Sequence, residues 1–382
     1  MSHRDKASDI RSIDTPFAAN NVRLSPREWI VALAVAAAIL LGIPFAWEHI
    51  EPIRLETNHR MPFSLGYDYW TYDRFCRKAS SDGDTTLIVG DSVVWGHFVG
   101  KDQTLSAHLN RAPGGGRFAN MGIDGIHPAA LVGLMKYYGQ SISDGKVILH
   151  CNLLWMSSPR RDLSDGKERS INHPDLIAQF IQRPECYKAS KTHRLGVLIG
   201  RKVPVFGWAN HMQIAYFDNS DLPTWTIRHP GENPAGAVTL ELPSPDESPT
   251  PKPDTRPWTQ KGIGQFDPPW VELDKSFQWR CFRETIDILA GRGNRVFVIV
   301  GPLNEHMLSE RARAAYAKSL AKTRKWLAER NIPHYAPGPL PEATYADASH
   351  PLAEGYAILV RELLDNEAFK RFTGEEGAAS EN

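Results

Sequence analysis

The sequence predicts an α/β protein, in which a three-layer α/β/α domain with a parallel sheet follows an N-terminal transmembrane helix. From Thr85 onward, short segments rich in Val and Ile alternate with segments of helical periodicity, as expected for parallel strands buried on both faces. The segment from Trp29 to Trp47 contains no charged residue. Between residues 157 and 274 the alternation stops and prolines are frequent, which predicts an irregular Pro-rich insertion in the domain.

The apolar segment 29–47 is predicted to be a single-pass signal anchor. As a helix it would extend roughly 28 Å, about the thickness of the hydrocarbon core, with Trp29 and Trp47 at the two interfaces. It is apolar on every face, which disfavours a buried helix. The long polar leader and the lack of a small-x-small site before Glu48 disfavour a cleaved signal peptide. Positive charges are more frequent before the span than after it, so residues 1–28 are expected to form a disordered cytoplasmic tail and the domain to be extracytoplasmic, on the periplasmic side.

The predicted domain covers residues 85–366. A juxtamembrane segment, 48–84, precedes it and is expected to pack onto it through its aromatic side chains, and a disordered tail, 367–382, follows it. Strands are expected at 85–89, 117–120, 146–150, 295–300 and, with a weaker pattern, 332–335. Helices are expected at 102–111, 127–142, 275–290, 307–330 and 351–364. Strands that alternate with helices are typical of βαβ units and a parallel sheet.

Composition excludes several classes of function. Lysine plus arginine and aspartate plus glutamate both total 44, so there is no basic field for nucleic acid and no acidic field for a cationic partner. No His-x-x-x-His or carboxylate cluster indicates a metal, and the glycines at 114–116 precede a strand rather than a helix, so neither a metal nor a phosphate-binding cofactor is expected. The four cysteines lack CxxC or zinc spacing, and a Cys186–Cys281 disulfide is one option for an extracytoplasmic domain. Cys151 is expected to be a small buried residue.

Two short motifs suggest acyl-transfer chemistry. Ser92 follows the first predicted strand in Gly90-Asp91-Ser92, and Asp347-Ala348-Ser349-His350 lies near the C-terminal end. A serine hydroxyl is a weak nucleophile until an imidazole removes its proton, and a carboxylate then fixes the tautomer of that imidazole. The end of a parallel strand is also where α/β proteins place ligands. The sequence therefore predicts a triad of Ser92, His350 and Asp347.

The order of these motifs resembles that of the SGNH/GDSL hydrolase superfamily, whose members have an α/β/α fold with a parallel sheet. The family carries its nucleophile in Gly-Asp-Ser and its acid and base in a late Asp-x-x-His. The resemblance implies that Ser92 is the nucleophile, that His350 is the general base and later the general acid, and that Asp347 orients the imidazole. It covers separate blocks between about 85 and 365, without the insertion or the transmembrane segment.

The resemblance also implies an oxyanion hole formed by Ser92, Gly125 and Asn152. The segment 120–125 resembles the family's second block, in which an Asn is followed by a Gly whose N–H faces the oxyanion; Gly125 is the preferred match and Gly122 the competing one. The third block is normally Gly-x-Asn-Asp, whereas this chain has His150-Cys151-Asn152-Leu153, so only the Asn is retained. An Asn amide at that position can still donate to an oxyanion.

Other polar residues follow the strands. Asn304 and His306 come after the fourth predicted strand, at the same edge as Ser92, and are candidates for substrate contact. His127 and His150 are expected to be structural histidines.

The leading interpretation is a membrane-anchored extracytoplasmic serine esterase, acting on O-acyl esters such as O-acetyl groups of an envelope polysaccharide through an acyl-serine intermediate. The first alternative is an O-acyltransferase that receives the acyl group from a multi-spanning membrane acyltransferase and passes it to a glycan. The second is a non-catalytic binding protein on the same scaffold.

Overall fold

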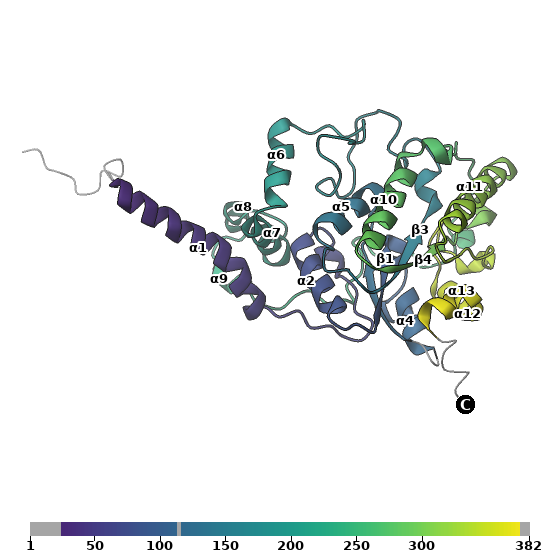
Figure 1. The fold of residues 1–382 in the computed structure, drawn as a ribbon, viewed down its shortest axis with the longest axis horizontal. Coiled ribbons are helices and arrows are strands. Elements are labelled where there is room, and N and C mark those ends of the chain that lie inside the picture. Colours follow the sequence, from purple (N-terminus) through teal and green to yellow (C-terminus); the bar gives the residue numbers. More distant parts are fainter. Residues whose placement is uncertain (1–23, 113–115, 375–382) are drawn as a thin grey trace, which may run out of the picture.

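The computed structural model describes residues 24–112 and 116–374 (Figure 1). Most of the predicted N-terminal tail and part of the glycine run at 114–116 therefore lie outside the described residues. Five parallel strands form one sheet in the order β2-β1-β3-β4-β5. The strands are β1 (Thr85–Gly90), β2 (Arg117–Gly122), β3 (Lys146–Cys151), β4 (Arg295–Val300) and β5 (His334–Tyr335). All five predicted strands are confirmed, including the weakest.

The sheet is buried on both faces, because successive side chains of a strand point to opposite sides. In β3, Val147 and Leu149 belong to one apolar core and Ile148 to the other. The first core is completed by α2 (Tyr69–Ser80), α5 (Pro128–Tyr137), α10 (Phe277–Gly291) and α11 (Glu310–Glu329). The second is completed by α3 (Ser92–Trp95), α4 (Leu105–Arg111), α12 (Ala353–Asp365) and α13 (Glu367–Thr373). Helices thus cover both faces of the sheet.

Several helices begin later than the sequence predicts, because capping side chains set their first residue. Thr104, Ser276 and Ser309 each accept a hydrogen bond from the backbone N–H three residues ahead, which starts α4, α10 and α11. The helix expected at 127–142 ends at Tyr137, where the N–H groups of Tyr138 and Gly139 both donate to the carbonyl of Leu134. All five helices predicted in the domain are present, but their bounds differ from the predicted ones.

The predicted disordered tail from residue 367 is wrong over its first part. Residues 367–373 form α13, which Asn366 caps through the N–H of Phe369. Phe369 and Phe372 are fully buried against Phe297 of β4. Two aromatic side chains one turn apart give this short helix an apolar face, and the domain therefore extends to at least residue 373.

Helix α1 (Pro26–Ile50) projects away from the domain (Figure 1). Ser25 and Glu28 form a capping box at its start, so the helix begins before the predicted span of 29–47 and continues past it. Its large apolar side chains are mostly exposed, and only Pro44 is buried. By length and composition, α1 can cross a membrane.

The interval 157–274 was predicted to be irregular, but four helices form within it: α6 (Lys191–Gly200), α7 (Pro204–Tyr216), α8 (Leu222–Arg228) and α9 (Pro234–Ala237). Prolines in the first turn start three of these helices, α7, α8 and α9, and the side chain of Ser190 caps α6. The Pro-rich segment 242–257 has no helix or strand, as expected. Helix α7 packs against the C-terminal end of α1, where the rings of Trp47 and Trp208 lie 5.9 Å apart.

A buried charged cluster joins the end of α1 to the domain. Glu51 accepts hydrogen bonds from Arg74 of α2, at 2.6 Å, and from Nε2 of His211 of α7, at 3.1 Å. The Nδ1 of His211 lies 2.6 Å from Asp68. Burial would raise the pKa of Glu51, but His211, Tyr216 and Arg74 outweigh it and lower that pKa to about 2. Burial would likewise lower the pKa of His211, but Asp68 and Glu51 raise it to about 9.

The cysteines do not form the disulfide considered from the sequence. Cys76, Cys151, Cys186 and Cys281 are all buried free thiols. Burial raises the pKa of Cys281 to about 12, so this thiol is not a nucleophile at neutral pH. Of the aromatic side chains expected to pack segment 48–84 onto the domain, Tyr69, Trp70 and Tyr72 are buried and Tyr67 is exposed.

Candidate active site

Ser92 lies at a sharp strand-to-helix junction at the carboxyl end of β1. Strand β1 ends at Gly90, Asp91 caps α3, and Ser92 is the first residue of that helix. A Cβ atom on Gly90 would lie 2.5 Å from Val94 and 2.7 Å from His150, so only glycine allows the helix to pack this closely on the sheet. Because β1 lies between β2 and β3, Ser92 lies at the point where the strand order reverses, the usual ligand site of open α/β sheets.

The three predicted triad residues are brought together. The Nε2 of His350 lies 2.8 Å from the Oγ of Ser92, although the two residues are 258 positions apart in the chain. The Nδ1 of His350 lies 2.8 Å and 2.9 Å from the two carboxylate oxygens of Asp347. The Oδ1 of Asp347 also accepts the backbone N–H groups of Ser349 and His350, at 2.9 Å and 3.0 Å. The Asp-x-x-His spacing thus forms a closed turn that fixes both side chains.

The electrostatics of this group suit a general base. Burial alone would lower the pKa of His350, but the Asp347 carboxylate outweighs it and the pKa is raised. Burial alone would raise the pKa of Asp347, whereas His350 and the two backbone donors hold it well below its usual range. The imidazole therefore has a permanently ionised partner that stabilises its protonated form.

Two of the predicted oxyanion donors are backbone N–H groups. Within residues 24–112 and 116–374, the N–H groups of Ser92 and Gly125 donate to no other group. Gly125 has a φ of +70°, which favours glycine. The competing choice, Gly122, is excluded because its N–H donates to Asn120, at 3.0 Å. The N–H of Ser92 lies at the N-terminus of α3, where helical backbone groups favour negative charge.

Asn152, the third predicted donor, is buried and held by Asp91. Its Nδ2 donates to Asp91 at 2.8 Å, and its Oδ1 accepts the N–H of Leu154. One hydrogen of the amide is thus used, and the second has no acceptor within the described part of the chain. Asp91 also accepts from the N–H of Val93 and from the indole of Trp155, at 3.0 Å each.

His150 occupies the position at which the Gly-x-Asn-Asp pattern has glycine. Its side chain is buried, and its Nδ1 and Nε2 lie 3.1 Å from Asp91 and 2.9 Å from the carbonyl of Gly301. Burial would raise the pKa of Asp91, but His150 and Asn152 lower it to about 2. His150 therefore supports the loop beneath Ser92, as expected for a structural histidine. His127 is also structural, since it caps α5.

The structure gives Asn304, a candidate for substrate contact, a supporting position beneath the loop of Asp347. Asn304 is fully buried, and its Nδ2 donates to the carbonyl of Asp347, at 3.1 Å, while its own N–H donates to Ala348. It therefore supports the loop that carries the acid and the base. His306 is partly buried and its Nε2 lies 3.0 Å from the carbonyl of Leu340, so its ring is engaged in the fold.

No sequence motif indicated the residues that surround His350. Its ring lies edge-on to Phe98, with centroids 5.2 Å apart, and 5.8 Å from the ring of His97. The Nδ1 of His97 lies 2.6 Å from Asp124, which makes a second His–Asp pair. Lys261, from the insertion, places its Nζ over Phe98 and donates to the carbonyl of Ala346. His97 and Phe98 lie in the turn that follows α3, and no motif in the sequence singled them out.

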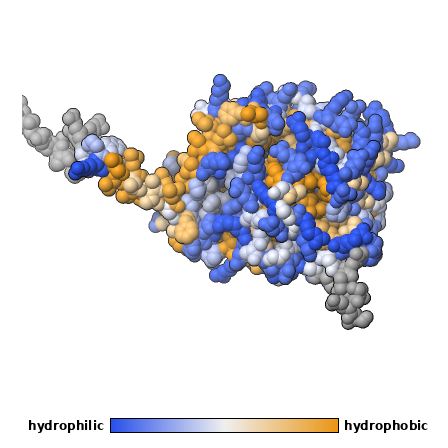
Figure 2. Space-filling view, in the orientation of Figure 1, coloured by the Kyte–Doolittle hydropathy of each residue, from blue (hydrophilic) through white to orange (hydrophobic). Residues whose placement is uncertain are grey.

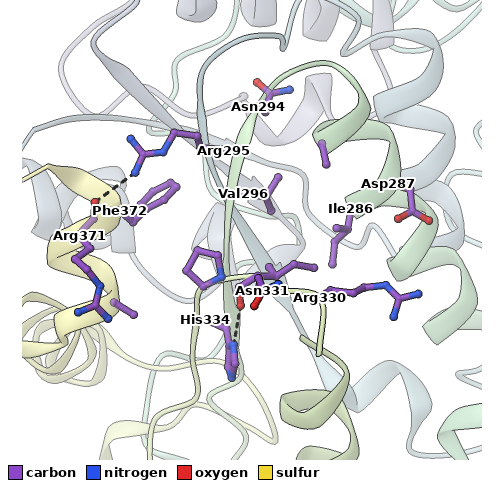
Figure 3. Close-up of a pocket in the computed structure, with 14 residues that line it drawn as sticks. Ile286, Asp287, Asn294, Arg295, Val296, Arg330, Asn331, His334, Arg371 and Phe372 are labelled. Carbon is purple, nitrogen blue, oxygen red and sulfur yellow. Dashed lines mark hydrogen bonds between the residues drawn. The ribbon is translucent and has the colours of Figure 1, made fainter. Parts of the chain in front are cut away.

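Two cavities differ in their relation to this site. One of about 400 Å³ lies between the segment after Ser92, with His97, Phe98 and Gln103, and the Pro-rich segment around Pro249 and Pro253. Another of about 810 Å³ lies at the opposite edge of the sheet, where Arg295 begins β4 and His334 begins β5 (Figure 3). Only the first adjoins the triad.

Among the described residues, no group of three or more His, Cys, Asp or Glu side chains is arranged to hold a metal ion. The candidate site comprises Ser92, His350 and Asp347, which contact one another, together with Gly125 and Asn152 as candidate oxyanion donors. No protein-family model and no curated protein sequence matches this chain.

Proposed function

We propose that the chain is a membrane-anchored serine esterase of the SGNH type, which cleaves O-acyl esters through an acyl-serine intermediate. The observation that carries this proposal is the continuous hydrogen-bonded series from Asp347 through His350 to Ser92, with separations of 2.8 Å at both steps. A serine in this setting, at a helix N-terminus and at the carboxyl edge of a parallel sheet, has the surroundings that nucleophilic catalysis requires.

In the proposed mechanism, His350 takes the proton of Ser92 as the Oγ attacks the ester carbonyl. The negative charge of the tetrahedral intermediate would be stabilised by the N–H groups of Ser92 and Gly125 and by the amide of Asn152. His350 then gives its proton to the departing alkoxide, which leaves as an alcohol, and an acyl ester remains on Ser92. A water molecule, deprotonated by His350, attacks this ester and releases the carboxylic acid, which restores the free serine.

Transfer to a sugar hydroxyl is the second candidate, since it uses the same acyl-serine with a different acceptor. The cavity of about 400 Å³ beside His97 and Phe98 favours it, because its other wall comes from the Pro-rich segment and the space exceeds what one water needs. A glycan in this cavity would exclude water from the acyl ester. The donor would then be a multi-spanning membrane acyltransferase.

We further propose that α1 anchors the chain as a single span with the domain on the extracytoplasmic side. The length and exposed apolar surface of α1 support an anchor, and the excess of positive charge before the span supports this orientation. Substrates would then be acyl esters of the cell envelope, for which O-acetylated polysaccharide is the expected class.

The test is the intact mass of the full chain after exposure to a fluorophosphonate. We expect one adduct on the wild type, none on Ser92→Ala, and one on Ser248→Ala, a matched control from the Pro-rich wall of the neighbouring cavity. No adduct on a folded wild type would refute catalysis by this triad and favour the non-catalytic binding protein. If the adduct forms, the reaction of p-nitrophenyl acetate with and without added glycan distinguishes an esterase from an O-acyltransferase. Product that forms only when glycan is present would contradict the esterase proposal.

A further inference from the structure

An exposed apolar patch covers the helices that the insertion contributes beside α1. We define the apolar patch as Leu195 and Ile199 of α6, Phe206 of α7, and Leu222 and Ile227 of α8. Ile227 is 80% exposed, Leu195 54% and Phe206 51%. Single exposed apolar side chains are ordinary in soluble proteins, but a group of five on neighbouring helices indicates an interaction surface.

The apolar patch continues the apolar surface of α1. Figure 2 shows the hydrophobic residues over α6 and α7 adjoining those of the projecting helix. The contact between the two is direct, because Trp47 of α1 packs against Trp208 and Tyr216 of α7. Trp225 of α8 belongs to the same cluster. The patch therefore lies where α1 meets the domain, next to the C-terminal end of the predicted span.

The segment that forms α6 and α7 carries fixed charges of one sign, whereas Asp218 and Asp221 precede α8. Residues 186–217 contain no aspartate or glutamate. The same stretch contains five fixed positive charges, on Lys188, Lys191, Arg194, Arg201 and Lys202. Lys191 and Lys202 are exposed at the two ends of α6, on either side of Leu195 and Ile199. Basic side chains interspersed with exposed apolar ones are typical of surfaces that lie on an anionic membrane.

We propose that the apolar patch rests in the lipid surface from which α1 emerges, with its basic residues among anionic headgroups. This proposal rests on the proposed membrane anchor and adds a second contact to it. A single helix would leave the domain free to tilt, whereas two contacts fix its orientation. The buried cluster of Glu51, Asp68, Arg74 and His211 joins α1 to α2 and α7, and so makes the angle between the span and the patch part of the fold.

The experiment measures the depth of spin labels in vesicles that contain the full chain. Labels are placed at Ile199→Cys and Ile227→Cys in the patch, at Leu33→Cys in α1, and at Lys325→Cys of α11 as the water-exposed control; the four native thiols are buried. In vesicles of phosphatidylcholine with phosphatidylglycerol, we expect both patch labels to gain collisions with oxygen and lose them with a nickel chelate, as the Leu33 label does. The Lys325 label should show the opposite.

The outcomes distinguish a failure of the proposed lipid contact from a failure of the proposed membrane anchor. Patch labels that stay in water while the Leu33 label lies in lipid would overturn the lipid contact and leave the anchor intact. Water exposure at all four labels would overturn both. Patch labels that become dry only when a multi-spanning membrane protein is added would overturn lipid as the occupant and assign the patch to that protein.

A charge variant tests the role of the basic residues. Lys191→Glu combined with Lys202→Glu should shift the patch labels toward water in vesicles that contain phosphatidylglycerol, and Lys318→Glu combined with Lys325→Glu, on α11, should not. An equal shift in both double variants would refute headgroup recognition by α6.

Discussion

Replacing Asp347 with Asn should nearly abolish the reactivity of Ser92 without unfolding the chain. The Oδ1 of Asp347 accepts three donors: the N–H groups of Ser349 and His350 and the Nδ1–H of His350. In Asp347→Asn the amide oxygen would keep the two backbone donors, so the new NH₂ group would face Nδ1, 2.9 Å away. An NH₂ group donates, and Nδ1 must then accept.

This change inverts the tautomer of His350. Its proton moves to Nε2, which faces the Oγ of Ser92 at 2.8 Å and can no longer remove the serine proton. A base held in the wrong tautomer costs about 10⁴-fold in rate, or ~5.5 kcal/mol of transition-state stabilisation. We therefore expect the rate of fluorophosphonate labelling to fall by about four orders of magnitude.

The pH dependence gives an independent check. Asp347 raises the pKa of His350, and the base must be neutral to act, so wild-type labelling should fall as pH drops through that raised pKa. Without the carboxylate the pKa of His350 falls, and the residual reaction should persist to lower pH. Asp254→Asn, an exposed carboxylate of the Pro-rich segment, is the matched control. Labelling of Asp347→Asn at the wild-type rate, with an unshifted profile, would refute the assigned role.

Three further changes test the fold around the site. His211→Ala removes one partner from each of two buried carboxylates, Glu51 and Asp68, and should cost ~3–5 kcal/mol in urea unfolding at pH 7. Because the pKa of His211 is raised to about 9, its contribution to stability is complete below about 6.5 and is lost as pH rises through 9. The stability of the variant should therefore match that of the wild type better in alkaline solution. Phe372→Ala should cost ~3–5 kcal/mol, whereas a disordered tail would give no change. Asn304→Ala should slow labelling of Ser92 and leave the KM for p-nitrophenyl acetate nearly constant, since the side chain supports Asp347; a raised KM with unchanged kcat would instead support substrate contact.

The strands and five helices of the domain could be predicted from local sequence, because the period of apolar residues is itself a local property. The helices of the insertion and α13 were not predicted. Val147, Ile148 and Leu149 are continuous in sequence and face two cores, which is the pattern of a parallel strand covered on both sides. Helix ends were less predictable, since hydrogen bonds from capping residues such as Thr104 set them. The tail at 367 was misjudged because the burial of Phe369 depends on a strand 70 positions earlier, around Phe297.

The sequence by itself determined which residue types the candidate site offers: Ser92 after a strand, and Asp347 three residues before His350. Tertiary structure alone decided that they meet, across 258 positions, and which neighbours each one has. It also decided that the amide of Asn152 is held by Asp91, that Asn304 is buried, and that α7 packs on α1. The physical reason is the same throughout: residue type sets what a side chain can donate or accept, but long-range packing selects its partner.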